Sequence, residues 1–336
     1  MSTKLDKIHK ELSTPKTNDG RLFFHPILMM HAATMYGKTY TDFMTDYRVL
    51  VDSNLHLLDL YDHDAVSVIS DPYREATAFG AQVDFSGDKF PVLHPLIRSL
   101  QDVENLSIPN VYDHERTLDR IKGVELFRQK LGNPFPIIGW VEGPLAEASD
   151  LMGLTEVLMD LMMDPSKINL LLQKTLAVAK EFALAQIKAG ANIIGVGDAV
   201  CSQISLETYE EFCLPLHKEL FEFIHQNGAL VKLHICGNIT HLLPALAKLD
   251  IDILDIDWMV DIITANKILG ESVMVCGNID PVAVVLEGTK DLIDEKFDNL
   301  KTSLPLKNWI FMAGCEIPRD TSKETMLYLR QISSKS

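Results

Sequence analysis

The stretch Val231-Lys-Leu-His-Ile-Cys-Gly-Asn-Ile239 decides how the chain folds and works. Its apolar run ends in His234 and Cys236, and the Gly-Asn pair that follows is typical of a strand that turns into a helix. Residues two apart on a strand point to the same side. An imidazole nitrogen and a thiolate can therefore face one point at the end of a strand, which is predicted over residues 230–236.

Short apolar segments alternate with helical patterns on both sides of this stretch. Further strands are predicted at residues 26–33, 65–69, 136–143, 191–198, 251–258, 272–280 and 309–315. Helices are predicted at 41–61, 113–131, 205–227, 240–249, 261–269, 283–300 and 322–332, with two more inside 150–190 that break near Asp164-Pro165. Such alternation indicates a parallel sheet with helical crossovers. The pattern predicts a single (β/α)8 TIM barrel, an α/β fold.

Two segments fall outside this repeat. Residues 1–20 read as an N-terminal extension, a short helix and a polar loop that cap one end of a barrel spanning 21–336. Residues 76–95 read as a hairpin-like insertion after the second strand. An open doubly wound sheet is the alternative fold. No Gly-x-Gly-x-x-Gly follows an early strand, so the dinucleotide-binding signature of that fold is missing.

Composition excludes several functional classes. The 336 residues are 47% hydrophobic and 23% charged, enough for a large core. A net charge of -16 argues against a nucleic-acid partner, because phosphates need clustered Lys and Arg, and it disfavours an anionic membrane surface. No signal-peptide core and no apolar run long enough to span a membrane occurs. Five cysteines, mostly in apolar segments, fit free or metal-bound thiols in a reducing cytoplasm.

Polar residues at the predicted strand ends are candidates for chemistry, because barrel active sites lie at the C-terminal ends of the strands. These ends carry His31, Asp71, Glu142, Asp198, His234, Cys236, Asp257, Asn278, Asp280, Cys315 and Glu316. Glu142, Asp198 and Asp257 are the candidates for catalytic residues that position a substrate. Glu142 precedes Gly-Pro and could instead cap the next helix, and Asp255 could point into the barrel or pair with a cation.

A zinc site is the central hypothesis. Catalytic zinc takes about three protein ligands and keeps one position open. His234 and Cys236 supply two, and Cys315, near the end of the last strand, supplies a third. Two thiolates favour zinc over harder cations. The alternative is that these cysteines are small buried hydrophobes. This is the favoured interpretation for Cys201, Cys213 and Cys276, although Cys201, near a strand end, is also a weaker reserve ligand.

The motifs resemble those of a known enzyme group. Leu-His-Ile-Cys-Gly-Asn at 233–238, Gly-Asn-Ile-Asp-Pro at 277–281 and Ala-Gly-Cys-Glu-Ile-Pro at 313–318 are similar to the zinc methyltransferases of the uroporphyrinogen decarboxylase superfamily, which include methylcobamide:coenzyme M methyltransferases. The resemblance covers residues 21–331. It implies a (β/α)8 barrel, one Zn²⁺ held by His234, Cys236 and Cys315, and a methylcobamide carried by a corrinoid protein as methyl donor.

The decarboxylase branch of this superfamily is the first alternative. Its Arg-Gln-Ala-Gly-Arg-Tyr signature supplies arginines for substrate carboxylates. The matching stretch here is Met30-His-Ala-Ala-Thr-Met-Tyr36, which has neither arginine. Ser70-Asp71 with the later Ala-Phe-Gly80 resembles the region of the decarboxylase that contains its substrate-binding aspartate. We interpret Asp71 as inherited architecture.

The sequence thus predicts a zinc-dependent, corrinoid-dependent methyltransferase with a small-molecule thiol acceptor such as coenzyme M. Alternatives are the decarboxylase, a non-thiol acceptor such as tetrahydrofolate, and a non-catalytic subunit that docks a corrinoid protein. A sulfonate acceptor needs a cation, for which Arg74 and Arg319 are candidates. The oligomeric state stays open, and a homodimer is compatible with the sequence.

Overall fold

Eight parallel strands form the centre of the molecule. The structure is a computed structural model that describes residues 4–12, 21–133 and 135–334. The strands are hydrogen-bonded in the order β1-β10-β9-β8-β7-β6-β5-β2. Their bounds are β1 Phe23–Phe24, β2 Val66–Ser67, β5 Ile137–Glu142, β6 Ile193–Gly197, β7 Leu230–His234, β8 Ile253–Asp255, β9 Met274–Cys276 and β10 Trp309–Phe311. The amide of Asp64, two residues before β2, donates to the Phe24 carbonyl of β1 at 2.9 Å, which brings the two ends of this strand order together. The predicted (β/α)8 barrel is therefore confirmed.

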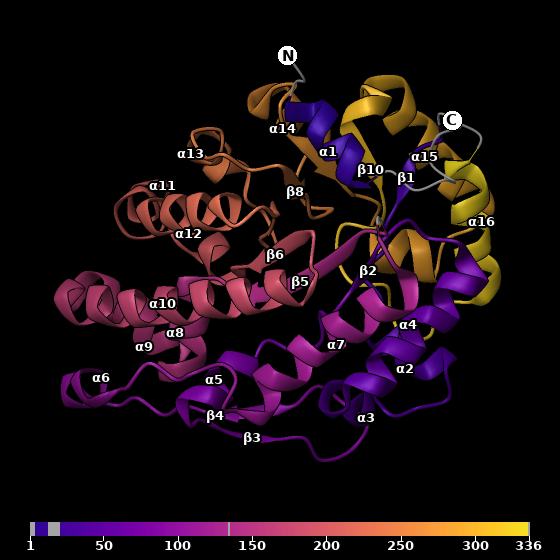
Figure 1. The fold of residues 1–336 in the computed structure, drawn as a ribbon. Helices are drawn as coiled ribbons and strands as arrows, with labels where there is room; N and C mark the ends of the chain where they lie inside the picture. Colours follow the sequence, from indigo (N-terminus) through magenta and orange to yellow (C-terminus); the bar gives the residue numbers. More distant parts are fainter. Residues whose placement is uncertain (1–3, 13–20, 134, 335–336) are drawn as a thin grey trace.

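Helices surround the strands (Figure 1). The helices before β5 are α1 Lys4–Leu12, α2 Met30–Met35, α3 Tyr40–Thr45, α4 Tyr47–Tyr61, α5 Arg74–Phe79, α6 Leu100–Asn105 and α7 Glu115–Leu131. Those from β5 to β7 are α8 Pro144–Met152, α9 Leu154–Met163, α10 Pro165–Ala189, η1 Ala199–Gln203, α11 Leu206–Thr208, η2 Tyr209–Cys213 and α12 Leu214–Gln226. The remainder are η3 Thr240–Leu242, α13 Leu243–Leu246, α14 Ile262–Leu269, η4 Pro281–Leu286, α15 Lys290–Ser303, η5 Leu306–Asn308 and α16 Lys323–Ser333.

The strands are buried on both faces, which is why they read as continuous apolar runs. Every residue of β5 and β6 is buried. Such burial is typical of parallel barrel strands, because crossover helices cover one face and the packed barrel interior covers the other. The predicted insertion is also confirmed, since β3 Gln82–Asp84 and β4 Val92–His94 pair as an antiparallel hairpin.

Helix α1 covers the N-terminal end of the barrel. Ile8 and Leu12 are 0% and 4% exposed, and they belong to a buried cluster with residues from the starts of the strands, among them Phe23, Ile138 and Ile193. The expected cap therefore closes the end opposite the strand ends that carry the candidate chemistry. The polar loop predicted to follow it lies at residues 13–20, outside the described ranges.

The prediction of the first strand is wrong in its position. The run 26–33 contains no strand: β1 lies earlier, at Phe23–Phe24, and Met30–Met35 forms α2. A short apolar run suits a buried strand or a buried helix, and here the helical alternative wins. His31 consequently lies inside a helix rather than at a strand end. It is buried, with Nε2 3.0 Å from the hydroxyl of Tyr61.

Several predicted boundaries also shift. The helix predicted at 41–61 is divided by Asp46, which ends α3 and accepts a hydrogen bond from the Arg48 amide as the N-cap of α4. The 150–190 region belongs to three helices rather than two, with the predicted break confirmed at Asp164. Strands β7 and β10 end early, so Cys236 and Cys315 lie in the loops that follow them.

No helix in the described part of the chain is long and apolar enough to cross a membrane.

Candidate active site

A cavity of about 270 Å³ opens at the C-terminal ends of the strands. Its walls are partly apolar, with Trp140 of β5 among them, and they carry a small set of polar groups. The lining residues that bear on its chemistry are Asp71, Arg74, Glu142, His234, Cys236, Cys315 and Glu316. The three predicted metal ligands therefore share one cavity.

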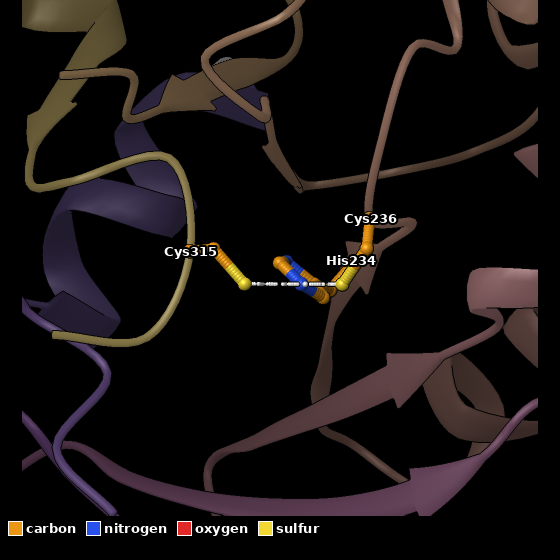
Figure 2. A group of neighbouring side chains, drawn as sticks. All are labelled: His234, Cys236 and Cys315. Atoms are coloured by element: carbon orange, nitrogen blue, oxygen red, sulfur yellow. Dashed lines mark hydrogen bonds between the residues drawn. The ribbon is translucent and has the colours of Figure 1, made fainter. Parts of the chain in front are cut away.

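The candidate ligands come from two segments that face each other: His234 ends β7 and Cys236 lies in the loop after it, whereas Cys315 lies in the loop after β10 (Figure 2). The Nε2 atom of His234 lies 3.0 Å from Sγ of Cys236 and 4.0 Å from Sγ of Cys315. The two sulfurs are 3.9 Å apart. Tetrahedral zinc with bonds of about 2.0–2.3 Å holds such donors about 3.5–3.8 Å apart. The two distances to Cys315 lie close to this range, whereas His234 and Cys236 are at hydrogen-bond distance and would have to separate by about 0.5 Å around a zinc ion.

Asp255 supports the imidazole from behind. The Nδ1 atom of His234 lies 3.2 Å from Oδ2 of Asp255, and the other carboxylate oxygen of Asp255 accepts a hydrogen bond from Lys232. All three side chains are buried. A carboxylate behind a histidine ligand fixes the ring orientation and leaves Nε2 to the metal. The sequence suggested only that Asp255 points into the barrel or pairs with a cation, and both suggestions are confirmed.

The electrostatics of the cluster favour a thiolate. Hydrogen bonding from Cys236 and from His234, together with the positive charge of the imidazole, outweighs burial and lowers the pKa of Cys315 to about 4. Burial lowers the pKa of His234, but the Cys236 sulfur and Asp255 outweigh it and raise this pKa well above the usual value. A thiophilic cation would displace the shared protons, since metal ligands bind in deprotonated form.

Asp257 holds the loop that carries Cys236. Its Oδ2 atom accepts a hydrogen bond from the Gly237 amide at 2.6 Å, and its carbonyl accepts one from the Asn278 side chain at 3.2 Å. The side chain is buried and does not line the cavity. Its contacts are those of a residue that positions Cys236. The predicted contact with substrate remains a prediction.

The loop that carries Cys315 passes very close to the backbone of Trp258, which follows the end of β8. A Cβ atom at Gly314 would lie 2.4 Å from the backbone nitrogen of Trp258. Real Cβ atoms do not approach a backbone atom so closely, so glycine is required for this path. Gly314 therefore lets the loop after β10 reach the cavity wall.

Asp198 anchors a helix rather than facing the cavity. Its Oδ1 accepts a hydrogen bond from the Ala146 amide at 2.8 Å at the start of α8, and its Oδ2 lies 3.0 Å from Nε2 of His217. Asp198 is fully buried and is not among the lining residues. The reserve ligand Cys201 lies with Asp198 and His217 in a second, fully buried group. The sequence placed Asp198 at the correct strand end, but its side chain points to α8.

Glu142 lines the cavity as predicted and pairs with Arg74. The Nη2 atom of Arg74 donates to Oε1 of Glu142 at 2.7 Å, and Nε lies 3.5 Å from Oε2 of Glu75. Burial, opposed by Arg74, raises the pKa of Glu142 to about 8. Sequence reasoning missed the Arg74–Glu142 pair, because the two residues are far apart in the chain.

The remaining polar candidates also have protein partners. Asp71 accepts a hydrogen bond from Arg116, and the guanidiniums of Arg116 and Arg74 outweigh burial and lower its pKa to about 2. Arg319 donates to the carboxylate of Asp88 at 3.0 Å and does not line the cavity. Cys213 and Cys276 are buried, as the hydrophobe interpretation predicts.

The family model for uroporphyrinogen decarboxylase (URO-D) matches residues 25–335. The chain belongs to the uroporphyrinogen decarboxylase family. The superfamily predicted from the motifs is thereby confirmed, and it is an enzyme family. A uroporphyrinogen decarboxylase of Nostoc sp. is 26% identical over 325 residues, 90% of each chain. One from Chlorobium phaeovibrioides is 30% identical over 285 residues, 80% of each chain.

Similar folds occur among solved structures. A methyltransferase from Methanosarcina mazei superposes with a TM-score of 0.87 at 18% identity, covering 100% of this chain and 99% of that one. A B12-independent methionine synthase from Shewanella sp. has a TM-score of 0.59 at 14% identity, covering 86% of each chain. At these identities the likeness concerns the barrel fold, so the chemistry has to be argued from the site.

Proposed function

We propose that this URO-D family protein is a zinc-dependent methyltransferase, which moves a methyl group from a methylated corrinoid protein to a thiol. One observation carries the proposal: His234, Cys236 and Cys315 converge on the wall of the cavity, with Asp255 3.2 Å behind the imidazole. A catalytic zinc site uses about three such ligands and keeps a fourth position for substrate.

The donor set suits a particular chemistry. When bound there, a zinc ion would supply the Lewis acidity that keeps an acceptor thiol deprotonated at neutral pH. His234 would hold it through Nε2, and Cys236 and Cys315 through their sulfurs. Asp255 orients His234, and Asp257 and Gly314 hold the two loops that bring the sulfurs together. The protein's part is thus to fix the nucleophile's position and protonation state.

The transfer itself balances without another reactant. The acceptor sulfur forms a bond to the methyl carbon while the cobalt–carbon bond of the donor breaks, and both electrons of that bond stay on cobalt as Co(I). The thiol proton leaves to solvent. The donor is carried by a partner protein, which would dock at the open end of the cavity. Ile27, Met29, Ile69 and Trp140 form the apolar part of the cavity wall, which limits the access of water to the reacting sulfur.

Uroporphyrinogen decarboxylation is the competing function, favoured by the names of the curated relatives. Its substrate carries many carboxylates and needs cations. Arg74 is the only Arg or Lys among the residues that line the cavity, and it already pairs with Glu142. The signature arginines are absent from α2, where the stretch reads Met30 to Tyr36. This charge distribution supports methyl transfer over decarboxylation.

The test is a direct comparison of the two reactions. Purified zinc-loaded protein is incubated with methylcobalamin and a panel of thiols, and separately with uroporphyrinogen. We expect methylthioether and cob(I)alamin, and no coproporphyrinogen. Decarboxylation by protein stripped of metal, with no methyl transfer to any thiol, would establish the competing function instead.

A further inference from the structure

A second cavity lies beside the segment that supports the metal loops. Its volume is about 440 Å³, larger than the 270 Å³ of the candidate active site. The loops after β8 and β9 form it together with η4 and α15, and among the described residues none lines both cavities. A cavity of this size, mostly apolar and with a few polar groups, is typical of a small-molecule site. The proposed methyl transfer makes no use of it.

Trp258 gives this cavity an aromatic wall. Its side chain is 47% exposed, whereas the other two tryptophans of the chain, Trp140 and Trp309, are 4% and 0% exposed. A large aromatic side chain left half in solvent at the wall of a cavity offers a flat apolar surface on which a ring can stack. Aliphatic side chains from η4 and α15 complete the apolar lining, namely Val284, Leu292 and Leu300. The wall therefore suits a ring compound.

The charged groups in the lining balance each other. Lys296 and Asp280 contribute one charge of each sign. The Asp280 carboxylate accepts hydrogen bonds from two backbone amides of η4 at 2.8 and 2.9 Å, and the Lys296 ammonium lies 3.3 Å from Glu295. Asp291 and Asp298, exposed on the same helix, would repel an anion. The lining therefore favours an uncharged ligand.

Two asparagine side chains supply the remaining polar contacts. Asn278 donates through Nδ2 to the carbonyls of Asp257 and Val260 at 3.2 and 2.6 Å, and its Oδ1 accepts no hydrogen bond within the described ranges. The side chain of Asn299 is exposed and makes no hydrogen bond to another described residue. A carboxamide offers both a donor and an acceptor. An amide group on the ligand would thus be matched by these two residues.

The same wall supports both metal loops. Asn278 donates to the carbonyl of Asp257, whose carboxylate accepts from the Gly237 amide in the loop after β7. The backbone nitrogen of Trp258 lies against the loop after β10, where a Cβ atom at Gly314 would be 2.4 Å away. A ligand that holds Trp258 and Asn278 would therefore also restrict the segment on which the two loops rest.

We propose that this cavity is an effector site for a small uncharged ring compound that carries an amide, and that its occupation strengthens metal binding by His234, Cys236 and Cys315. The ring stacks on Trp258, and the amide pairs with Asn299 and with Oδ1 of Asn278. A ligand that orders the supporting segment removes part of the conformational entropy that metal binding would otherwise cost. The inference goes beyond the proposed function and does not depend on which reaction the protein catalyses.

Titrations of the full chain with three simple probes test the ligand class. Benzamide has the ring and the amide, benzoate replaces the amide by a carboxylate, and acetamide lacks the ring. We expect benzamide to change the tryptophan fluorescence and to bind, by calorimetry, about tenfold more tightly than either of the others. Benzoate or acetamide binding as tightly as benzamide would overturn the assignment, as would no binding of benzamide.

Two neighbouring variants locate the site. Trp258→Ala removes the stacking surface, and we expect the calorimetric affinity for benzamide to fall about tenfold or more. Met259→Ala is the matched control, because Met259 is 49% exposed and does not line the cavity, and its affinity for benzamide should equal that of the wild-type protein. Equal affinities in the two variants would mean that benzamide binds elsewhere.

Reciprocity tests the link to the metal loops. Zinc affinity is measured by chelator competition with and without saturating benzamide, and benzamide affinity is measured with and without zinc. Coupled sites change each other's affinity by the same factor, which we expect to be about fivefold. Affinities that are equal with and without the other ligand would overturn the coupling. A protein that binds no zinc would overturn the coupling and the proposed function together, whereas the benzamide titrations decide the ligand class by themselves.

Discussion

At the scale of single residues, His234 shows how the surrounding side chains orient a proposed metal ligand. One nitrogen faces two sulfurs, and the other lies 3.2 Å from Asp255, whose second oxygen accepts from Lys232. Asp255 is fully buried, and burial alone would raise its pKa, but Lys232 and His234 outweigh burial and lower it. The carboxylate therefore stays ionised behind the imidazole, which strengthens a histidine ligand.

Asp255→Asn should weaken zinc binding by about 10–100-fold, because the imidazole loses its charged support. The measurement is a competition titration of zinc against a chromophoric chelator. The variant also leaves the ammonium group of Lys232 buried without a carboxylate, which lowers the free energy of unfolding.

The double variant Asp255→Asn with Lys232→Met separates these two effects. It removes the unpaired buried charge, so we expect stability to recover while zinc affinity remains low. Recovery of zinc affinity together with stability would show that Asp255 acts only on folding.

His63 makes stability depend on pH. It is 3% exposed at the N-terminal end of the barrel, and burial lowers its pKa from 6.5 to about 4. The unfolded chain therefore binds a proton below pH 6.5 that the folded chain refuses, so stability falls as pH falls from 6.5 toward 4. Between pH 7 and 4.5, the free energy of unfolding should fall by about 2 kcal/mol less in His63→Gln than in the wild-type protein.

Urea unfolding at the two pH values measures the effect of His63. Exposed His94 provides the matched control, since His94→Gln removes the same type of group from a solvated position. If the free energy of unfolding falls as much with pH in His63→Gln as in the wild-type protein, the account is contradicted.

The sequence predicts which candidate ligands come together better than it predicts the residues that hold them. His234 and Cys236 stand two residues apart at the end of an apolar run, and Cys315 follows the last strand, so strand position alone brings them together. The partners of these residues depend on side-chain direction across strands, which spacing does not encode. Asp198 and Asp255 illustrate the difference: both lie near strand ends, yet the first binds α8 and the second binds Lys232.

At the scale of elements, two loops decide whether the site forms. The loop after β7 is held by Asp257 through the Gly237 amide, and the loop after β10 passes Trp258 at Gly314. Both loops thus rest on residues 257–258, just beyond β8. This segment acts as a common support for Cys236 and Cys315.

Gly314→Ala should lower zinc affinity by about tenfold or more, because its new methyl group would meet the Trp258 backbone and displace Cys315. The same chelator competition measures it. Gly123→Ala in α7 adds an equal group away from the cavity, with Val68 Cγ1 as nearest atom at 3.3 Å, and should leave zinc affinity unchanged. Equal zinc affinity in both variants would rule out Gly314's role in placing Cys315.

Element boundaries are where sequence interpretation fails. The apolar stretch at 26–33 has no strong period, and the chain uses its second half as α2. Long apolar strands such as β5 and β6 are predicted correctly, because burial on both faces leaves no polar interruption. Short barrel strands such as β1 gain their structure from neighbours rather than from local propensity.

At the scale of the whole molecule, zinc would join distant parts of the chain. Its ligands follow β7 and β10, which are separated in the barrel by β8 and β9. A ligand that binds only the folded state stabilises it, by about 2.7 kcal/mol at one hundred times its Kd. We therefore expect zinc to raise the midpoint of thermal unfolding.

Two controls accompany that thermal measurement. Magnesium at equal concentration should have no effect, because thiolates are poor ligands for a hard cation. The Cys236→Ala, Cys315→Ala double variant should not respond to zinc. A response to zinc that persists in the double variant would place the ion elsewhere.

X-ray absorption at the zinc edge, recorded before and after the addition of an acceptor thiol, tests the central claim most directly. The account predicts zinc bound by two sulfurs and one imidazole nitrogen in the wild-type protein, and a third sulfur when the thiol is added. Zinc bound by oxygen and nitrogen alone, or a sulfur count that the thiol does not change, would contradict it.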